Sequence, residues 1–174
     1  MVRVREMTEA DIEGVSTVRV RGWRAAYAGM VPASYLEGMT VEEDARSRRS
    51  WFRRSSGRVL NLVAVNDRAE VVGWGCLGPE RDEASPGVGE VYALYVHPDL
   101  TGHGIGTQLV RALHSRAVER GFDTLTLWVF EDNLRARRFY ASHGYVADGG
   151  TRRDTFGAFV NGVVTELRYR RTGE

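Results

Sequence analysis

The sequence contains no lysine and a single cysteine, and both features exclude classes of protein. All 24 basic residues are arginine, which excludes a phosphate-binding loop of the NTPase type because that loop needs a lysine after its last glycine. One cysteine, Cys76, cannot form an internal disulfide, and in an apolar strand we expect it to pack rather than to react. No apolar run is long enough to cross a membrane or to act as a signal peptide, so we expect a cytoplasmic protein.

Length, composition and charge predict one globular domain over residues 1–174. A chain of this size can bury a substantial core, and its 43% hydrophobic and 10% aromatic residues are typical of a folded protein. The formal net charge of +1 gives no reason to expect nucleic-acid binding. No pair of His or Cys has the spacing of metal ligands, so we expect no metal.

Strand-like and helical segments alternate along the chain. We expect strands at 2–5, 59–65, 71–77, 88–96, 124–129, 145–146 and 163–169, with a hairpin turn at 66–69. We expect helices from Thr8 to about Tyr27, at 41–54, from the glycines at 102–106 to Gly121, and at 133–142, with a mobile loop at 78–87. This order predicts an α/β or α+β domain with a mixed sheet.

The most informative segment covers residues 94–107 and reads Leu-Tyr-Val-His-Pro-Asp-Leu-Thr-Gly-His-Gly-Ile-Gly-Thr. A strand is expected to end at its His-Pro pair, and the three glycines open a helix whose apolar residues recur every four positions. Glycine lets a backbone approach a ligand closely, and free amides at a helix N-terminus favour an anion by about 0.3–1 kcal/mol. The segment therefore predicts a pyrophosphate cradle, although its G-x-G-x-G spacing is not the G-x-G-x-x-G of dinucleotide-binding folds.

This segment resembles the acyl-CoA-binding motif of the GCN5-related N-acetyltransferase (GNAT) superfamily, Leu-x-Val-x-Pro-x-x-[Gln/Arg]-x-x-Gly-x-[Gly/Ala]. The residues that match are Leu94, Val96, Pro98, Gly104 and Gly106. Thr101 departs from the motif, which we expect to weaken cofactor binding without abolishing it. The resemblance implies that the amides of Gly102, His103, Gly104, Ile105, Gly106 and Thr107 hold the pyrophosphate of acetyl-CoA, and that Leu94, Tyr95 and Val96 hold its acetyl carbonyl and pantetheine. An ordinary glycine-rich helix start is the alternative.

A second motif follows about 30 residues later, at 133–145. On a helix, Asn133, Ala136 and Tyr140 share one face, with the first and last about 10 Å apart along the axis. The segment is similar to the family's Asn-x-x-Ala-x-x-Phe-Tyr pattern, which implies that Asn133 binds the pantetheine arm and that Tyr140 is the general acid. A helix N-cap at Asn133 and core packing at Tyr140 are the alternatives.

The candidate general base is Glu90, which corresponds by resemblance to a catalytic glutamate of the histone-acetylating branch of the superfamily. Simple alternation along the strand places Glu90 on the same face as Tyr92, Leu94 and Val96. The family usually has a bulge in this strand, which would break that parity. A solvated strand end is the other interpretation of Glu90.

Residues 22–32 resemble a segment of one bacterial subgroup of these enzymes that overhangs the acceptor site. Trp23 and Tyr27 lie four residues apart on the expected helix, so we take them as candidates for an aromatic wall that binds the acceptor. A core-facing aromatic pair explains the same spacing.

The resemblance implies a strongly twisted sheet of about six to seven strands, splayed at the acyl-CoA site and flanked by about four helices. It also implies transfer of an acetyl group from acetyl-CoA to a primary amine, which would be a small molecule, an antibiotic-like amine or a peptide N-terminus; a homodimer is common in the family. A non-catalytic acyl-CoA sensor is the alternative that Thr101 favours. A nucleotide-dependent transferase is disfavoured by the glycine spacing and the missing lysine.

Overall fold

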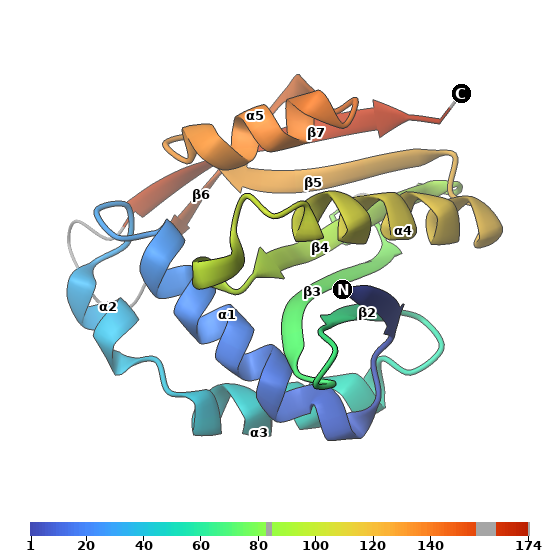
Figure 1. Ribbon diagram of the computed structural model, residues 1–174. Coiled ribbons are helices and arrows are strands. Elements are labelled where there is room, and N and C mark those ends of the chain that lie inside the picture. Colours follow the sequence, from blue (N-terminus) through green and yellow to red (C-terminus); the bar gives the residue numbers. More distant parts are fainter. Residues whose placement is uncertain (83–84, 156–162, 174) are drawn as a thin grey trace.

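The computed structural model describes residues 1–82, 85–155 and 163–173. They form a seven-stranded sheet in the order β1-β2-β3-β4-β5-β7-β6, in which β4 and β5 are parallel and the other neighbours antiparallel (Figure 1). The strands are β1 (Arg3–Glu6), β2 (Leu60–Val65), β3 (Val71–Pro79), β4 (Val88–Val96), β5 (Thr124–Phe130), β6 (Val146–Thr155) and β7 (Val163–Thr172). The α-helices of the described part are α1 (Ile12–Ala26), α2 (Ala33–Gly38), α3 (Val41–Arg54), α4 (Ile105–Glu119) and α5 (Leu134–Ser142). The predicted mixed α/β fold is confirmed.

Helices cover both faces of the sheet, and alternate residues of the central strands supply the two cores (Figure 1). Val63 and Val65 of β2 pack with α1 and α3, whereas Leu62 and Ala64 of the same strand pack with α4. Full burial of one such side chain contributes roughly 1.5–3 kcal/mol to folding. Among the described helices, none has the length and apolar character needed to cross a membrane.

The strands β4 and β5 diverge, and this divergence positions the functional site. They pair over three residues only, Val88–Glu90 against 124–126, although each strand continues beyond that point. A bulge in β4 lies where they part, because Cys76 of β3 is opposite Ala93 whereas the next residue, Leu77, is opposite Val91. This is the bulge that the resemblance implied: it breaks the simple alternation, so Glu90 does not share a face with Leu94 and Val96.

The local predictions differ from the structure mainly at element ends. The hairpin of β2 and β3 is confirmed, and Gly121 follows α4 with a φ of 79°, as a helix stop requires. Thr8 precedes a short 3-10 helix (Glu9–Asp11), and α1 begins only at Ile12. The sequence did not predict α2 or most of β6, which continues to Thr155. The expected loop at 78–87 is shorter, since β3 reaches Pro79, and its residues 83–84 lie outside the described ones.

Candidate active site

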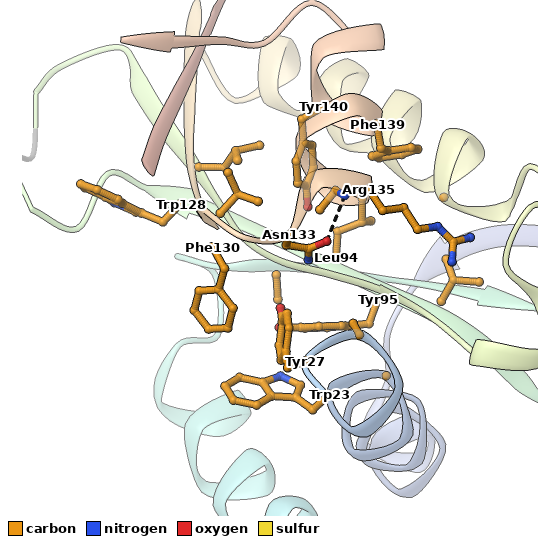
Figure 2. Close-up of a pocket in the computed structure, with 18 of the residues that line it drawn as sticks. Trp23, Tyr27, Leu94, Tyr95, Trp128, Phe130, Asn133, Arg135, Phe139 and Tyr140 are labelled. Carbon is orange, nitrogen blue, oxygen red and sulfur yellow. Dashed lines mark hydrogen bonds between the residues drawn. The ribbon is translucent and has the colours of Figure 1, made fainter. Parts of the chain in front are cut away.

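A cavity of about 980 Å³ opens between the diverging ends of β4 and β5 (Figure 2). This volume is within the range of small-molecule and cofactor sites. Of the predicted site residues, the cavity is lined by Trp23, Tyr27, Leu94, Tyr95, Val96, Gly102, Gly104, Gly106, Thr107, Asn133 and Tyr140. Glu90, His103 and Ile105 do not line it. The structure thus brings most of the predicted residues together around one space.

The glycine loop presents free backbone to this cavity. Gly102 and Gly104 have φ values of 84° and 79°, and a Cβ at either position would meet no atom within 4 Å. The N-cap of α4 is Gly104, which has no side chain to accept hydrogen bonds from the amides of the first turn. The first hydrogen bond of the helix is donated by the amide of Gln108 to the carbonyl of Gly104. The preceding amides, from Ile105 to Thr107, therefore have no partner inside the helix and are available to an anion.

Two predicted members of this loop do not present side chains to the cavity. The side chain of Ile105 is buried in the core between α4 and the sheet, so only its backbone amide can contribute to a ligand site. The ring of His103 is exposed, and its Nδ1 lies 3.2 Å from the carbonyl oxygen of Thr101. The Thr101 hydroxyl donates to the carbonyl of Pro98 at 3.0 Å, so this replacement of the family's polar residue is used to close the turn.

Asn133 is both a helix cap and a wall of the cavity. Its Oδ1 accepts a hydrogen bond of 3.1 Å from the amide of Ala136, the dashed line in Figure 2, which is the N-cap role considered from the sequence. Within the described chain, Nδ2 of the same side chain has no acceptor, and the residue lines the cavity. The capping bond therefore orients the amide so that its donor remains available to a ligand.

Tyr140 extends from α5 into the cavity, and its hydroxyl points toward Asn133 (Figure 2). The ring is half-buried and packs edge-on against Phe139 and Tyr145, with centroid distances of 5.4 and 5.8 Å. Burial, with smaller contributions from Tyr95 and Tyr145, raises the pKa of Tyr140 above its usual value. The hydroxyl therefore keeps its proton at neutral pH and is a potential proton donor.

The aromatic residues at the opposite end form a cluster that is partly core and partly cavity wall. The rings of Trp23 and Tyr27 are perpendicular with centroids 4.9 Å apart, and Phe130 lies 4.6 Å from Tyr27 (Figure 2). All three line the cavity, while Val31 and Leu36 pack behind them. The Trp23–Tyr27 pair is therefore both packed in a cluster and part of the cavity wall, and its binding of an acceptor stays a prediction.

Glu90 is buried beneath Arg81. Only 1% of Glu90 is exposed, and its carboxylate accepts three hydrogen bonds from Arg81, from the backbone amide at 3.0 Å, from Nε at 3.1 Å and from Nη2 at 2.5 Å. The Arg81 guanidinium also lies over the ring of Tyr92, 4.2 Å from its centroid, and lines the cavity. A ligand in the cavity consequently meets Arg81 and not the carboxylate.

The structure adds charged residues that sequence reasoning did not select. Glu166 of β7 is 7% exposed and lines the cavity, and Nε of Arg152 on β6 donates to it at 2.5 Å. The Arg152 guanidinium lies 4.4 Å from the ring centroid of Trp128. The only signal for Glu166 was its place in the expected strand 163–169. Within the described residues, no group of three His, Cys, Asp or Glu has an arrangement that would hold a metal ion.

Comparison with known proteins gives a consistent result. The profile of the Acetyltransferase (GNAT) family matches residues 22–145. The uncharacterized N-acetyltransferase YuaI of Bacillus subtilis is 32% identical over 133 residues, which are 76% of this chain and 74% of that protein. A mycothiol acetyltransferase of Kineococcus radiotolerans is 48% identical over 126 residues, 71% of this chain but 38% of its own length.

A solved N-acetyltransferase structure has a similar fold. The structure of PaiA N-acetyltransferase from Thermoplasma acidophilum, solved in complex with coenzyme A, superposes with a TM-score of 0.77 and 20% identity over 99% of both chains. The profile match covers most of this chain, and the predicted splayed fold is present. The chain therefore belongs to the acetyltransferase (GNAT) family and is an acetyl-CoA-dependent acetyltransferase.

Proposed function

We propose that the protein transfers the acetyl group of acetyl-CoA to a primary amine, with Tyr140 as the general acid. The observation that carries the proposal is one cavity that joins the free amides in the first turn of α4, the unpaired edge of β4 and the hydroxyl of Tyr140. When bound, acetyl-CoA supplies a thioester whose carbonyl carbon an amine can attack, with coenzyme A departing as a thiolate. A nucleotide that carries no pantetheine arm would leave the free edge of β4 without a hydrogen-bonding partner.

The residues that bind acetyl-CoA follow from the free hydrogen-bonding groups of the cavity. The amides of Ile105, Gly106 and Thr107 face the pyrophosphate, and the exposed Arg135 of α5, which also lines the cavity, adds positive charge near the phosphates (Figure 2). The Nδ2 of Asn133 donates to the pantetheine arm. The edge of β4 from Leu94 to Val96, which β5 does not cover, hydrogen-bonds the arm as an added strand would.

The proton required by the departing sulfur comes from Tyr140. Its raised pKa keeps the hydroxyl protonated until the C–S bond breaks; the sulfur then takes this proton, and the tyrosinate regains one from solvent before the next turnover. A positioned acid of this kind contributes about 10²- to 10⁴-fold to the rate.

The proton lost by the amine needs a carboxylate, and two are available. Glu90 is the candidate by resemblance, but it reaches the cavity only past Arg81. Glu166 lines the cavity directly, close to the aromatic end formed by Trp23, Tyr27 and Phe130. We assign to Glu166 the role of proton acceptor. Glu90 instead holds Arg81 in position.

The first experiment is calorimetric titration with acetyl-CoA, with free coenzyme A and ATP as comparators. We expect both coenzyme A species to bind and ATP not to bind. Amines are then screened by thiol release, and turnover with any primary amine supports transfer. Binding of acetyl-CoA without release of thiol across the panel would instead support the acyl-CoA sensor considered from the sequence.

A further inference from the structure

A second pocket, of about 560 Å³, lies on the α1 and α3 side of β4. It shares Trp23, Arg81, Tyr92, Ala93 and Tyr95 with the acetyl-CoA cavity, so the two spaces lie next to each other at the bulged part of β4. We call it the Arg48 pocket, after a buried arginine of its lining. Nothing in the proposed transfer mechanism uses it.

Two arginines of the Arg48 pocket depend on one carboxylate. Arg19 and Arg48 share a single carboxylate, with Nη1 of Arg19 2.5 Å and Nε of Arg48 3.2 Å from the two oxygens of Asp44. Arg48 is 9% exposed, and no described residue accepts a hydrogen bond from its two terminal nitrogens. The other carboxylate in the wall, Glu43, is exposed at the rim. A buried guanidinium with unused donors favours a carboxylate, which it can bind through two parallel hydrogen bonds.

The walls of the pocket are aromatic and flat. The Arg48 guanidinium lies 4.2 Å from the ring centroid of Trp74, and the ring of Tyr95 stacks on the same indole at 6.2 Å with an angle of 15°. Trp51 and Tyr35 complete the walls. Because Trp74 is 3% exposed and already packs against Arg48 and Tyr95, the surfaces on which a planar ligand ring can stack are the partly exposed rings of Tyr35, Trp51 and Tyr95, and the pocket volume is sufficient for one ring.

We propose that the Arg48 pocket binds the body of the acceptor, an aromatic ring that carries a carboxylate, while the amine of the same molecule lies in the acetyl-CoA cavity. The carboxylate pairs with Arg48, and the ring stacks on the aromatic walls. The two spaces are adjacent at β4, where they share lining residues, and the proposal requires that one ligand spans both. This inference rests on the proposed transfer to an amine.

The kinetic test uses a matched pair of amines that differ only in the carboxylate, 4-(2-aminoethyl)benzoate and 2-phenylethylamine. We expect kcat/KM to be about tenfold or more higher for the benzoate, since a hydrogen-bonded charge is worth that much. The Arg48→Met variant should bring the ratio close to one, and Arg48→Lys, which keeps the charge but not the planar fork, should give an intermediate ratio. The control is Arg46→Met, an exposed arginine on the same helix, which should keep the wild-type ratio.

The binding test is independent of acetyl transfer. The apo protein is titrated with 4-ethylbenzoate, which has no amine, and the indole N–H signals of Trp51 and Trp74 are followed by ¹⁵N NMR. Saturable shifts are expected in the wild type and in Arg46→Met, and their loss in Arg48→Met. Neutral 4-ethylbenzyl alcohol should bind more weakly.

Two results would overturn the inference while leaving transfer intact: equal kcat/KM for the two amines, or inorganic phosphate shifting the indoles as strongly as 4-ethylbenzoate, which would indicate a simple anion site. If 4-ethylbenzoate binds but no amine is acetylated, the proposed function fails, and the acceptor role of the Arg48 pocket fails with it.

Discussion

The hydroxyls of Tyr27, at the end of α1, and Tyr95, on β4, lie 3.2 Å apart and join the helix to the splayed strand. Burial is the main cause that raises the pKa of both phenols, and each also affects the other. Both hydroxyls therefore stay neutral at physiological pH. The negative charge at this end of the cavity comes instead from carboxylates such as Glu166, which contributes to the raised pKa of Tyr27.

Glu166 lines the cavity whereas Glu90 does not, and this difference predicts different effects of replacing each by glutamine. We expect Glu166→Gln to lower kcat by about 10²-fold or more at neutral pH, because it removes the carboxylate that accepts the proton of the amine. Higher pH, which deprotonates more of the free amine, should partly restore the rate. Steady-state kinetics from pH 6 to 10 measures both effects.

In Glu90→Gln, the loss should be smaller and should not recover with pH, because this change releases Arg81 rather than removing a base. The reverse order, with Glu90→Gln the more damaging and the one rescued at high pH, would return the role of base to Glu90.

Tyr140→Phe tests the acid. Removing the hydroxyl should lower kcat by about 10²- to 10⁴-fold with little change in acetyl-CoA affinity, because the ring and its packing remain. Thiol release gives kcat, and calorimetry gives the dissociation constant. Tyr169→Phe is the matched control, since its hydroxyl contacts Arg137 outside the cavity at 3.1 Å. Full activity of Tyr140→Phe across pH 6–9 would refute the assignment.

Gly104→Val tests the glycine cradle. The φ of 79° costs an L-residue roughly 1–2 kcal/mol, and a branched side chain would project where acetyl-CoA is expected to bind. We expect acetyl-CoA binding to be lost in calorimetric titration. Gly57→Val carries the same backbone strain, with a φ of 81° and no atom near a Cβ, but lies outside the cavity. A similar loss of stability with unchanged binding is expected there, and equal binding by both variants would contradict the cradle.

The parts of the site that could be predicted from the sequence are those encoded locally. The glycine loop and the α5 motif each place their ligand-facing groups by helix geometry alone, so Gly104, Asn133 and Tyr140 lie on the cavity as expected. The position of Glu90 depends instead on a bulge in β4 and on an arginine nine residues earlier in the chain, and neither has a local pattern.

Strand β6 was underpredicted for a related reason. Its residues are mostly exposed, it includes Gly149 and Gly150, and it lies at the edge of the sheet, so no alternation of apolar residues marks it. It forms because β7 offers a partner, with a register shift between Ala147 and Thr151. Arg152, Asp154 and the pairing of Glu166 could therefore not be assigned to the site before the sheet was known.

The stability of the protein in acid should depend on His114 of α4. Its Nε2 lies 3.0 Å from the hydroxyl of Tyr145, and burial, with the charges of Arg171 and His143, lowers the pKa of the imidazole to about 4. In the unfolded chain the imidazole has its usual pKa of about 6.5. Between about pH 4 and pH 6.5 the unfolded chain therefore binds more protons than the folded protein. The free energy of unfolding should thus be unaffected by His114 above pH 6.5 and should fall as the pH drops from 6.5 toward 4.

His114→Gln keeps a hydrogen-bonding side chain but cannot take up the proton, so its stability should fall less over the same interval. Urea denaturation at a series of pH values measures the difference. His103→Gln, which replaces an exposed ring, should follow the wild-type curve. The His114→Gln substitution removes only the group that is expected to bind an extra proton on unfolding. Parallel curves for His114→Gln and the wild type between pH 6.5 and 4 would therefore show that this imidazole is not what destabilises the protein in acid.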